Sequence, residues 1–300
     1  MTTIASPATA ATDPDRLTSL TVAAAAAAIR AGDVSPLELT HAYLARIDAV
    51  DLGIGVYLEV SRARALADAA RAGDELARRQ DRGPLHGVPV ALKDLIDTAG
   101  ITTAAGCGAY RHRVPAADAT VAARLREAGA VLLGKTNTHE LAFGVTTTNP
   151  HFGTTRNPHD PSRIPGGSSG GNGAALAAGL AAAAVGTDTG GSVRIPAAFC
   201  GCVGLKPTFG RVPTTGVATM SRIADHVGPM TRTVEDAALR SPSSPGTTRP
   251  TRPACPSRCR TMPPPCGRTS PGCGSASRGR LCGDCSTTTS GRRASRPSPS

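Results

Sequence analysis

The sequence predicts an α/β fold, in which a sheet carries helices on its faces, and two observations lead to this prediction. Residues 88–92, 130–133 and 182–185 are short apolar runs with the length of buried strands. Helical segments, residues 118–128 and 173–181, precede the second and third runs, and Asp118 is expected to cap the first helix. Strands that alternate with helices of this length are typical of a sheet covered by helices.

The chain before the first strand is predicted to be mostly helical. Residues 21–30 are rich in alanine, the strongest helix former. The stretch from Ser35 to Glu38 is a capping box with proline at the first helical position, so a second helix should begin there. Residues 62–79 predict a third helix, and residues 1–18 are expected to be disordered.

Charge and cysteine divide the chain into two parts near residue 240. The net charge is +11, but residues 241–300 alone contain ten Arg and a single acid, so the basic character belongs to this tail. Three scattered cysteines in residues 19–240 argue against a disulfide scaffold. The first 15 residues lack a secretory signal and the alanine run is too short to span a bilayer, which predicts a cytoplasmic protein that does not enter a membrane.

Two glycine- and serine-rich turns, residues 165–176 and 185–196, are the most informative part of the chain. Glycine allows backbone N–H groups to converge on one point. Ser192 follows Gly190 and Gly191 directly, so its hydroxyl is expected to lie beside such donors. An acyl-transfer site needs this arrangement for its nucleophile and its developing oxyanion.

Two other motif matches fail on their structural context. Residues 129–136 fit the phosphate-loop pattern, but a predicted helix precedes them and four apolar residues fill the middle. Residues 167–171 fit G-x-S-x-G with Ser169 at the centre, but a loop precedes them and His226 is the only histidine that follows.

Both turns, together with residues 87–94 and 198–208, resemble the amidase signature family, and the resemblance covers residues 20–239. It implies a mixed central sheet covered by helices, formed by residues 19–240 and incomplete at the C-terminal end. It also implies a Ser–cis-Ser–Lys triad, with Ser192 as nucleophile, Ser168 as bridging serine after a cis peptide bond, and Lys93 as base. The oxyanion donors implied are the N–H groups of Thr189, Gly190, Gly191 and Ser192.

The mechanism implied by the resemblance needs a neutral lysine, which burial can provide by disfavouring the charged form. Lys93 would accept a proton from Ser168 as Ser168 accepts one from Ser192. A surface lysine and an ion pair between Lys93 and Asp94 are alternative interpretations. Asp188 and Arg194 flank the nucleophile and are expected to form an ion pair that clamps the turn.

The predicted function is an amidohydrolase that releases ammonia or an amine from a small carboxylic amide, without metal or cofactor. One alternative is the glutaminase-type subunit of a tRNA-dependent amidotransferase, which would meet tRNA only indirectly and needs partner subunits. Ile195 stands where that subunit more often has glutamine, which favours the free-standing amidase. The other alternative is an inactive, truncated family member.

The tail, residues 241–300, has three interpretations. A metal module is disfavoured because only Cys282 and Cys285 have ligand-like spacing, and no histidine follows them. A nucleic-acid-binding tail would have the charge but no aromatic residues to stack on bases. The third interpretation is an out-of-frame translation, because residues 240–252 can be written in GC-rich codons whose shifted frame resembles the family.

Overall fold

The computed structural model describes residues 13–239. The predictions for residues 1–12 and for the tail therefore lie outside the described residues. Residues 14–18, expected to be disordered, instead begin helix α2 (Pro14–Ser19). Asp13 caps this helix by accepting the Asp15 N–H at 3.1 Å, and Pro14 occupies the first position, a start signal that the sequence analysis overlooked.

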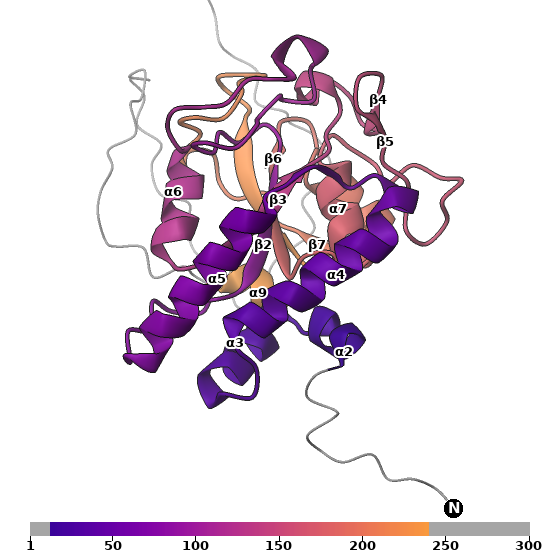
Figure 1. Cartoon of the computed structure of the whole chain (residues 1–300). Coiled ribbons are helices and arrows are strands. Elements are labelled where there is room, and N and C mark those ends of the chain that lie inside the picture. Colours follow the sequence, from indigo (N-terminus) through magenta and orange to yellow (C-terminus); the bar gives the residue numbers. More distant parts are fainter. Residues whose placement is uncertain (1–12, 240–300) are drawn as a thin grey trace, which may run out of the picture. The chain divides into compact units, whose positions relative to one another are not determined.

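A mixed six-stranded sheet forms the centre of the domain (Figure 1), as predicted. The strand order is β1-β3-β2-β6-β8-β7. The strands are β1 (Tyr57–Val60), β2 (Pro89–Lys93), β3 (Val131–Thr136), β6 (Ala183–Asp188), β7 (Val203–Gly204) and β8 (His226–Thr231). Strands β3, β2 and β6 are parallel, while β1, β8 and β7 pair antiparallel with their neighbours. A separate hairpin joins β4 (Thr148–Asn149) and β5 (Gly153–Thr154).

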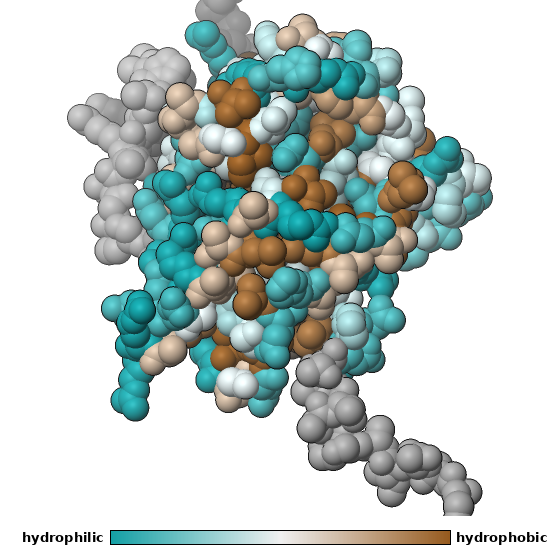
Figure 2. Space-filling view, viewed as in Figure 1, coloured by the Kyte–Doolittle hydropathy of each residue, from teal (hydrophilic) through white to brown (hydrophobic). Residues whose placement is uncertain are grey.

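Helices surround this sheet. The α-helices after α2 are α3 (Val22–Ala31), α4 (Pro36–Ile54), α5 (Arg62–Ala77), α6 (Thr120–Glu127), α7 (Gly170–Ala177), α8 (Arg194–Cys200) and α9 (Val234–Ala238), with 3-10 turns η1 (Gly108–Tyr110) and η2 (Glu140–Ala142). Helix α4 packs against α5, and α5 contacts β3. Figure 2 shows hydrophilic side chains along the lower-left part of α5 and hydrophobic ones toward the middle of the view. None of the helices described in residues 13–239 is both long and apolar enough to cross a membrane.

The predicted start of α4 is confirmed, but the predicted cap of α6 is wrong. Ser35 Oγ accepts the Glu38 N–H at 3.1 Å while Glu38 Oε2 accepts the Ser35 N–H at 2.8 Å, which completes the capping box. Helix α6 instead has Ala119 at its N-cap. The Asp118 carboxylate is engaged elsewhere, because it accepts the Ala99 N–H at 2.8 Å and pairs with Arg126 at 3.0 Å.

Helix α7 packs closely against its neighbours, and small residues make this possible. It begins at Gly170, three residues before the predicted start, so the first glycine-rich turn leads directly into it. A Cβ on Gly171 would lie 2.5 Å from the Asn137 carbonyl oxygen, and one on Gly173 would lie 2.9 Å from that of Pro196. The helix contacts β2, β3, β6 and β8. The glycines therefore let the segment that follows Ser168 approach the sheet.

Parallel strands bring their carboxyl ends to one edge of the sheet. Strand β2 ends at Lys93 and its parallel neighbour β6 ends at Asp188. Strand β8 begins at His226, which pairs with Asp188. The second glycine-rich turn therefore begins at the same edge of the sheet as the one where Lys93 lies.

Candidate active site

Lys93 lies at the centre of this edge as a fully buried amine. Its Nζ donates hydrogen bonds to Ser168 Oγ at 2.7 Å and to Thr187 Oγ1 at 2.8 Å. The surface-lysine interpretation is wrong, because the residue is 0% exposed. The ion pair with Asp94 is also absent among the described residues, since that carboxylate accepts the N–H groups of Ala104 and Gly106 instead.

The surroundings of Lys93 favour its neutral form. Burial lowers the pKa of Lys93 to about 7, and the more distant negative charges of Asp188 and Asp225 oppose this shift without cancelling it. Within residues 13–239 no carboxylate lies within ion-pair distance of the amine. An amine with this pKa is a competent proton acceptor near neutral pH, which an ordinary lysine is not.

Ser168 is held rigidly beside the lysine. The Gly167–Ser168 peptide bond is cis, as the family resemblance implied. The Ser168 carbonyl oxygen accepts the His139 N–H at 3.2 Å and the Thr147 hydroxyl at 3.3 Å. A Cβ on Gly167 would lie 2.8 Å from the Thr146 nitrogen, so glycine is required where the two segments meet. The Ser168 hydroxyl therefore has a fixed position against the Lys93 amine.

Ser192 lies in the second turn, next to the Ser168 segment. The Ser192 carbonyl oxygen accepts the Ser169 N–H at 3.1 Å, which joins the two turns. Ser192 is 6% exposed, whereas Ser168 is 0% exposed, so Ser192 is the less deeply buried of the two serines. Its hydroxyl makes no hydrogen bond to any residue within 13–239. The structure thus links Lys93 to Ser168 but leaves the predicted link from Ser168 to Ser192 unmade.

The predicted oxyanion donors are only partly available. The Gly191 N–H, predicted as one of these donors, already donates to Asp188 Oδ1 at 2.9 Å and is therefore engaged in this structure. The reason is that the Asp188 carboxylate, at the end of β6, turns back to cap the residues that follow. In the described part of the chain the N–H groups of Thr189, Gly190 and Ser192 have no acceptor. These three remain as candidate donors for a negatively charged oxygen.

The predicted ion pair beside the nucleophile is confirmed. Arg194 Nε and Nη2 each donate to one oxygen of Asp188 at 2.9 Å. Burial by itself would raise the pKa of Asp188, but hydrogen bonds from Arg194, Val193 and Gly191 outweigh burial and lower that pKa. A carboxylate that stays charged keeps residues 191–194 folded around it.

Sequence reasoning missed Thr187, which accepts the second hydrogen bond from Lys93. Thr187 is buried near the end of β6. A hydroxyl residue at the end of an otherwise apolar strand was the signal available, since a buried hydroxyl needs a partner.

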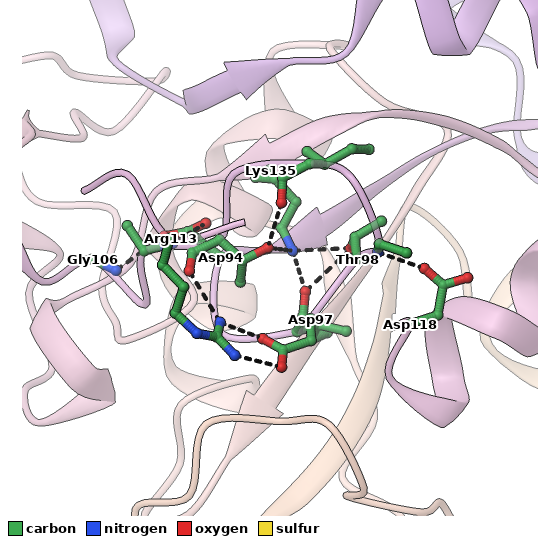
Figure 3. Close-up of polar contacts among 12 residues, drawn as sticks. Asp94, Asp97, Thr98, Gly106, Arg113, Asp118 and Lys135 are labelled. Atoms are coloured by element: carbon green, nitrogen blue, oxygen red, sulfur yellow. Dashed lines mark hydrogen bonds and ion pairs between the residues drawn. The ribbon is translucent and has the colours of Figure 1, made fainter. Parts of the chain in front are cut away.

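A second buried lysine lies near the site but has different partners (Figure 3). Lys135 Nζ donates to the Ile96 carbonyl oxygen and to the hydroxyls of Thr98 and Thr103. Burial lowers the pKa of Lys135 to about 8, while the negative charge of Asp94 opposes the shift. Conversely, burial raises the pKa of Asp94 to about 6 against the pull of Lys135.

Strand register explains why only one of the two lysines meets the serines. Lys135 on β3 pairs with Leu92 on β2, so the two side chains lie on the same face of the sheet. Lys93, the next residue on β2, points to the opposite face. The Lys135 face carries the loop that contains Thr98 and Thr103, whereas the Lys93 face carries Ser168.

The two discarded motif matches have structural roles. Most of residues 129–136 form strand β3, with Lys135 buried, which is not the geometry of a phosphate-binding loop. Ser169 is fully buried and its hydroxyl donates to the Thr187 carbonyl oxygen at 3.2 Å. A nucleophile elbow would instead expose this hydroxyl.

Comparisons with known proteins agree with this geometry. A family model described as Amidase matches residues 38–262. Over 211 residues the chain is 50% identical to the A subunit of glutamyl-tRNA(Gln) amidotransferase from Carboxydothermus hydrogenoformans, a match that covers 70% of this chain and 44% of that protein. Over 222 residues it is 52% identical to the corresponding protein of Chloroflexus aurantiacus, covering 73% of this chain and 45% of the relative.

A solved structure gives the same relation. The native peptide amidase from Stenotrophomonas maltophilia matches with a TM-score of 0.70 and 43% identity, over 73% of this chain and 46% of that one. The chain spans less than half the length of the relatives it matches. With the matched family model extending over most of its length, the chain belongs to the amidase signature family.

Proposed function

We propose that this chain cleaves a carboxylic amide through an acyl-enzyme formed on Ser192. The observation that carries the proposal is the 2.7 Å hydrogen bond between the buried amine of Lys93 and the hydroxyl of Ser168. A lysine with a pKa of about 7 beside a serine is a base without a histidine. The Ser192 turn adjoins this pair through the Ser169 N–H.

In the proposed reaction the neutral Lys93 amine accepts the Ser168 proton while Ser168 accepts the Ser192 proton. Ser192 Oγ attacks the amide carbon, and the N–H groups of Thr189, Gly190 and Ser192 stabilise the oxygen anion. The proton returns to the nitrogen as the C–N bond breaks, and water then hydrolyses the ester. The missing contact between the two serine hydroxyls does not oppose this route, because catalytic hydrogen bonds often tighten only when substrate binds.

The curated relatives favour a second candidate function, a glutaminase-type subunit. Both relatives described above, at 50% and 52% identity, are A subunits of glutamyl-tRNA(Gln) amidotransferases. In this case the amide would be the side-chain carboxamide of glutamine, and the ammonia released would be used by an amidotransferase complex. This assignment explains the relatives better than a free-standing amidase, and it requires partner subunits.

The experiment measures ammonia release by the purified whole chain from simple aliphatic amides and, separately, from L-glutamine. We expect turnover of at least one of them, lost by about 10³-fold or more in Ser192→Ala and in Lys93→Ala. Ser162→Ala, an exposed serine of the loop before the first turn, is the control and should keep the wild-type rate.

The substrate that is turned over separates the candidates. Release from glutamine alone would support the glutaminase-type subunit, and release from simple amides would support the amidase. A wild-type chain that releases ammonia from neither substrate would contradict the proposal that this chain cleaves amides by itself. Full activity in Ser192→Ala would refute the assignment of the nucleophile.

A further inference from the structure

Two different carboxylates form hydrogen bonds with the turn that carries Ser192, one with each half of the turn. Asp188 fixes the second half, because it accepts the N–H groups of Gly191 and Val193 and pairs with Arg194. The first half, Thr189 and Gly190, has no backbone hydrogen bond from its N–H groups within the described residues. A Cβ on Gly190 would meet no atom within 4 Å, so the space around this half is open.

A side chain from another part of the chain fastens this first half. The Thr189 hydroxyl donates to Asp225 Oδ1 at 2.6 Å. This contact joins positions 36 residues apart in the sequence. It is the only hydrogen bond from Thr189 or Gly190 to a distant segment in residues 13–239, so the orientation of these two peptide units depends on it.

Asp225 is itself held in place. Its carboxylate accepts the Met220 N–H at 2.9 Å and the Ser221 N–H at 3.0 Å, and its own N–H donates to the Ser221 carbonyl oxygen at 3.1 Å. The next residue, His226, begins β8 and pairs with Asp188 at the end of β6. The Asp225 carboxylate therefore connects the first half of the turn to residues that lie next to β8.

We infer that Asp225 is a positioning residue for acyl transfer, which holds the Thr189 hydroxyl so that the Thr189 and Gly190 N–H groups face the developing oxyanion. The inference rests on the proposed function, because it concerns the oxygen of an acyl group bound to Ser192. Asp225 does not touch the reacting atoms. It acts through Thr189, and the side-chain hydroxyl of Thr189 serves to orient its own backbone.

The test uses Thr189→Val, which keeps the shape of the side chain but lacks the hydroxyl, and Asp225→Ala. The whole chain is treated with an alkyl fluorophosphonate, which transfers its alkylphosphonyl group to Ser192 Oγ as fluoride leaves and the serine proton passes to Ser168 and Lys93. The phosphoryl oxygen then occupies the oxyanion position. We expect the second-order labelling rate at Ser192 to fall about 10- to 100-fold in both variants, since one oxyanion donor contributes about 10²–10³.

Controls separate positioning from folding. Thr189→Ser restores the hydroxyl and should recover most of the rate lost in Thr189→Val. Thr208→Val removes the hydroxyl of an exposed threonine and should label at the wild-type rate. Where an amide is turned over, kcat should fall in Thr189→Val while KM stays within about twofold, because the interaction strengthens in the transition state.

The possible failures are distinct. Wild-type protein that is not labelled at Ser192 overturns the proposed function and, with it, this inference. Labelling of wild-type protein together with unchanged rates in Thr189→Val and Asp225→Ala overturns the inference alone. A slow Thr189→Val that Thr189→Ser does not rescue also overturns it, because the hydroxyl would then not be the cause.

Discussion

At the scale of single residues, the two buried lysines differ in what they can do because they have different partners. Lys135 donates to three oxygens, one of them a backbone carbonyl that cannot exchange protons. Lys93 donates to two hydroxyls, and one of these belongs to Ser168 on the cis peptide. Both amines therefore contact hydroxyls, but only Lys93 contacts the hydroxyl of Ser168, whose segment adjoins the turn that carries Ser192.

The pH dependence of activity should report the ionisation of Lys93. The base works only when neutral, and the pKa of Lys93 is about 7, so kcat/KM should rise with pH through about 7 and level off above about 8. Lys93→Arg keeps a cation that does not lose its proton and should be inactive at every pH. A kcat/KM that is flat between pH 6 and 9 would contradict the role of this lysine as base.

At the scale of elements, Lys135 and Asp94 hold the loop that follows β2 in place through hydrogen bonds. The Asp94 carboxylate accepts the N–H groups of Ala104 and Gly106, and Lys135 holds the Thr98 and Thr103 hydroxyls. Replacing this lysine leaves buried acceptors and a buried carboxylate without their cation. The loop and the end of β2 should then lose stability together.

We therefore expect Lys135→Met to lower the free energy of unfolding by about 3 kcal/mol, measured by urea denaturation. Lys93→Met is the matched control on the adjacent strand. It should change stability by less than about 1 kcal/mol, because it removes an amine whose burial is costly and leaves two hydroxyls that can pair elsewhere. An equal decrease in the free energy of unfolding in both variants would show that both lysines stabilise the fold.

The elements that were predictable from sequence are those with a local signal. The capping box from Ser35 to Glu38 and the apolar run of β2 depend on neighbours in the chain, and both are confirmed. Strands β1 and β8 were missed because their antiparallel pairing depends on distant partners, and β8 contains Pro229 and Gly228, which have low strand propensity.

The residues of the candidate site also differ in whether a local sequence signal or a distant contact defines them. Lys93, Ser168, Ser192 and the pair of Asp188 with Arg194 were identified from motifs that surround them in sequence. The contributions of Thr187 and Asp225, and the occupation of the Gly191 N–H, follow from contacts between side chain and turn that no spacing encodes.

At the scale of the whole molecule, residues 13–239 bury one large and two small hydrophobic clusters yet leave large apolar side chains exposed. Phe143 is 77% exposed and Ile223 is 85% exposed. Phe143 follows η2, in the segment whose Thr147 hydroxyl donates to the Ser168 carbonyl oxygen. Ile223 lies in the loop that ends at Asp225. Exposed apolar side chains promote association between molecules when they form part of a larger apolar patch.

Replacing both residues should therefore reduce association without loss of stability. In the double variant Phe143→Ser and Ile223→Ser we expect lower light scattering at a given protein concentration. The unfolding free energy should change by less than about 1 kcal/mol, because neither side chain contributes much buried area and surface substitutions usually change stability by less than about 0.5 kcal/mol each.

Leu39→Ser, at a fully buried position of α4, is the contrasting control and should destabilise the protein strongly. A large loss of stability in the double variant would mean that Phe143 and Ile223 are covered in solution, and the exposed apolar surface would have to be reassigned as an occupied interface.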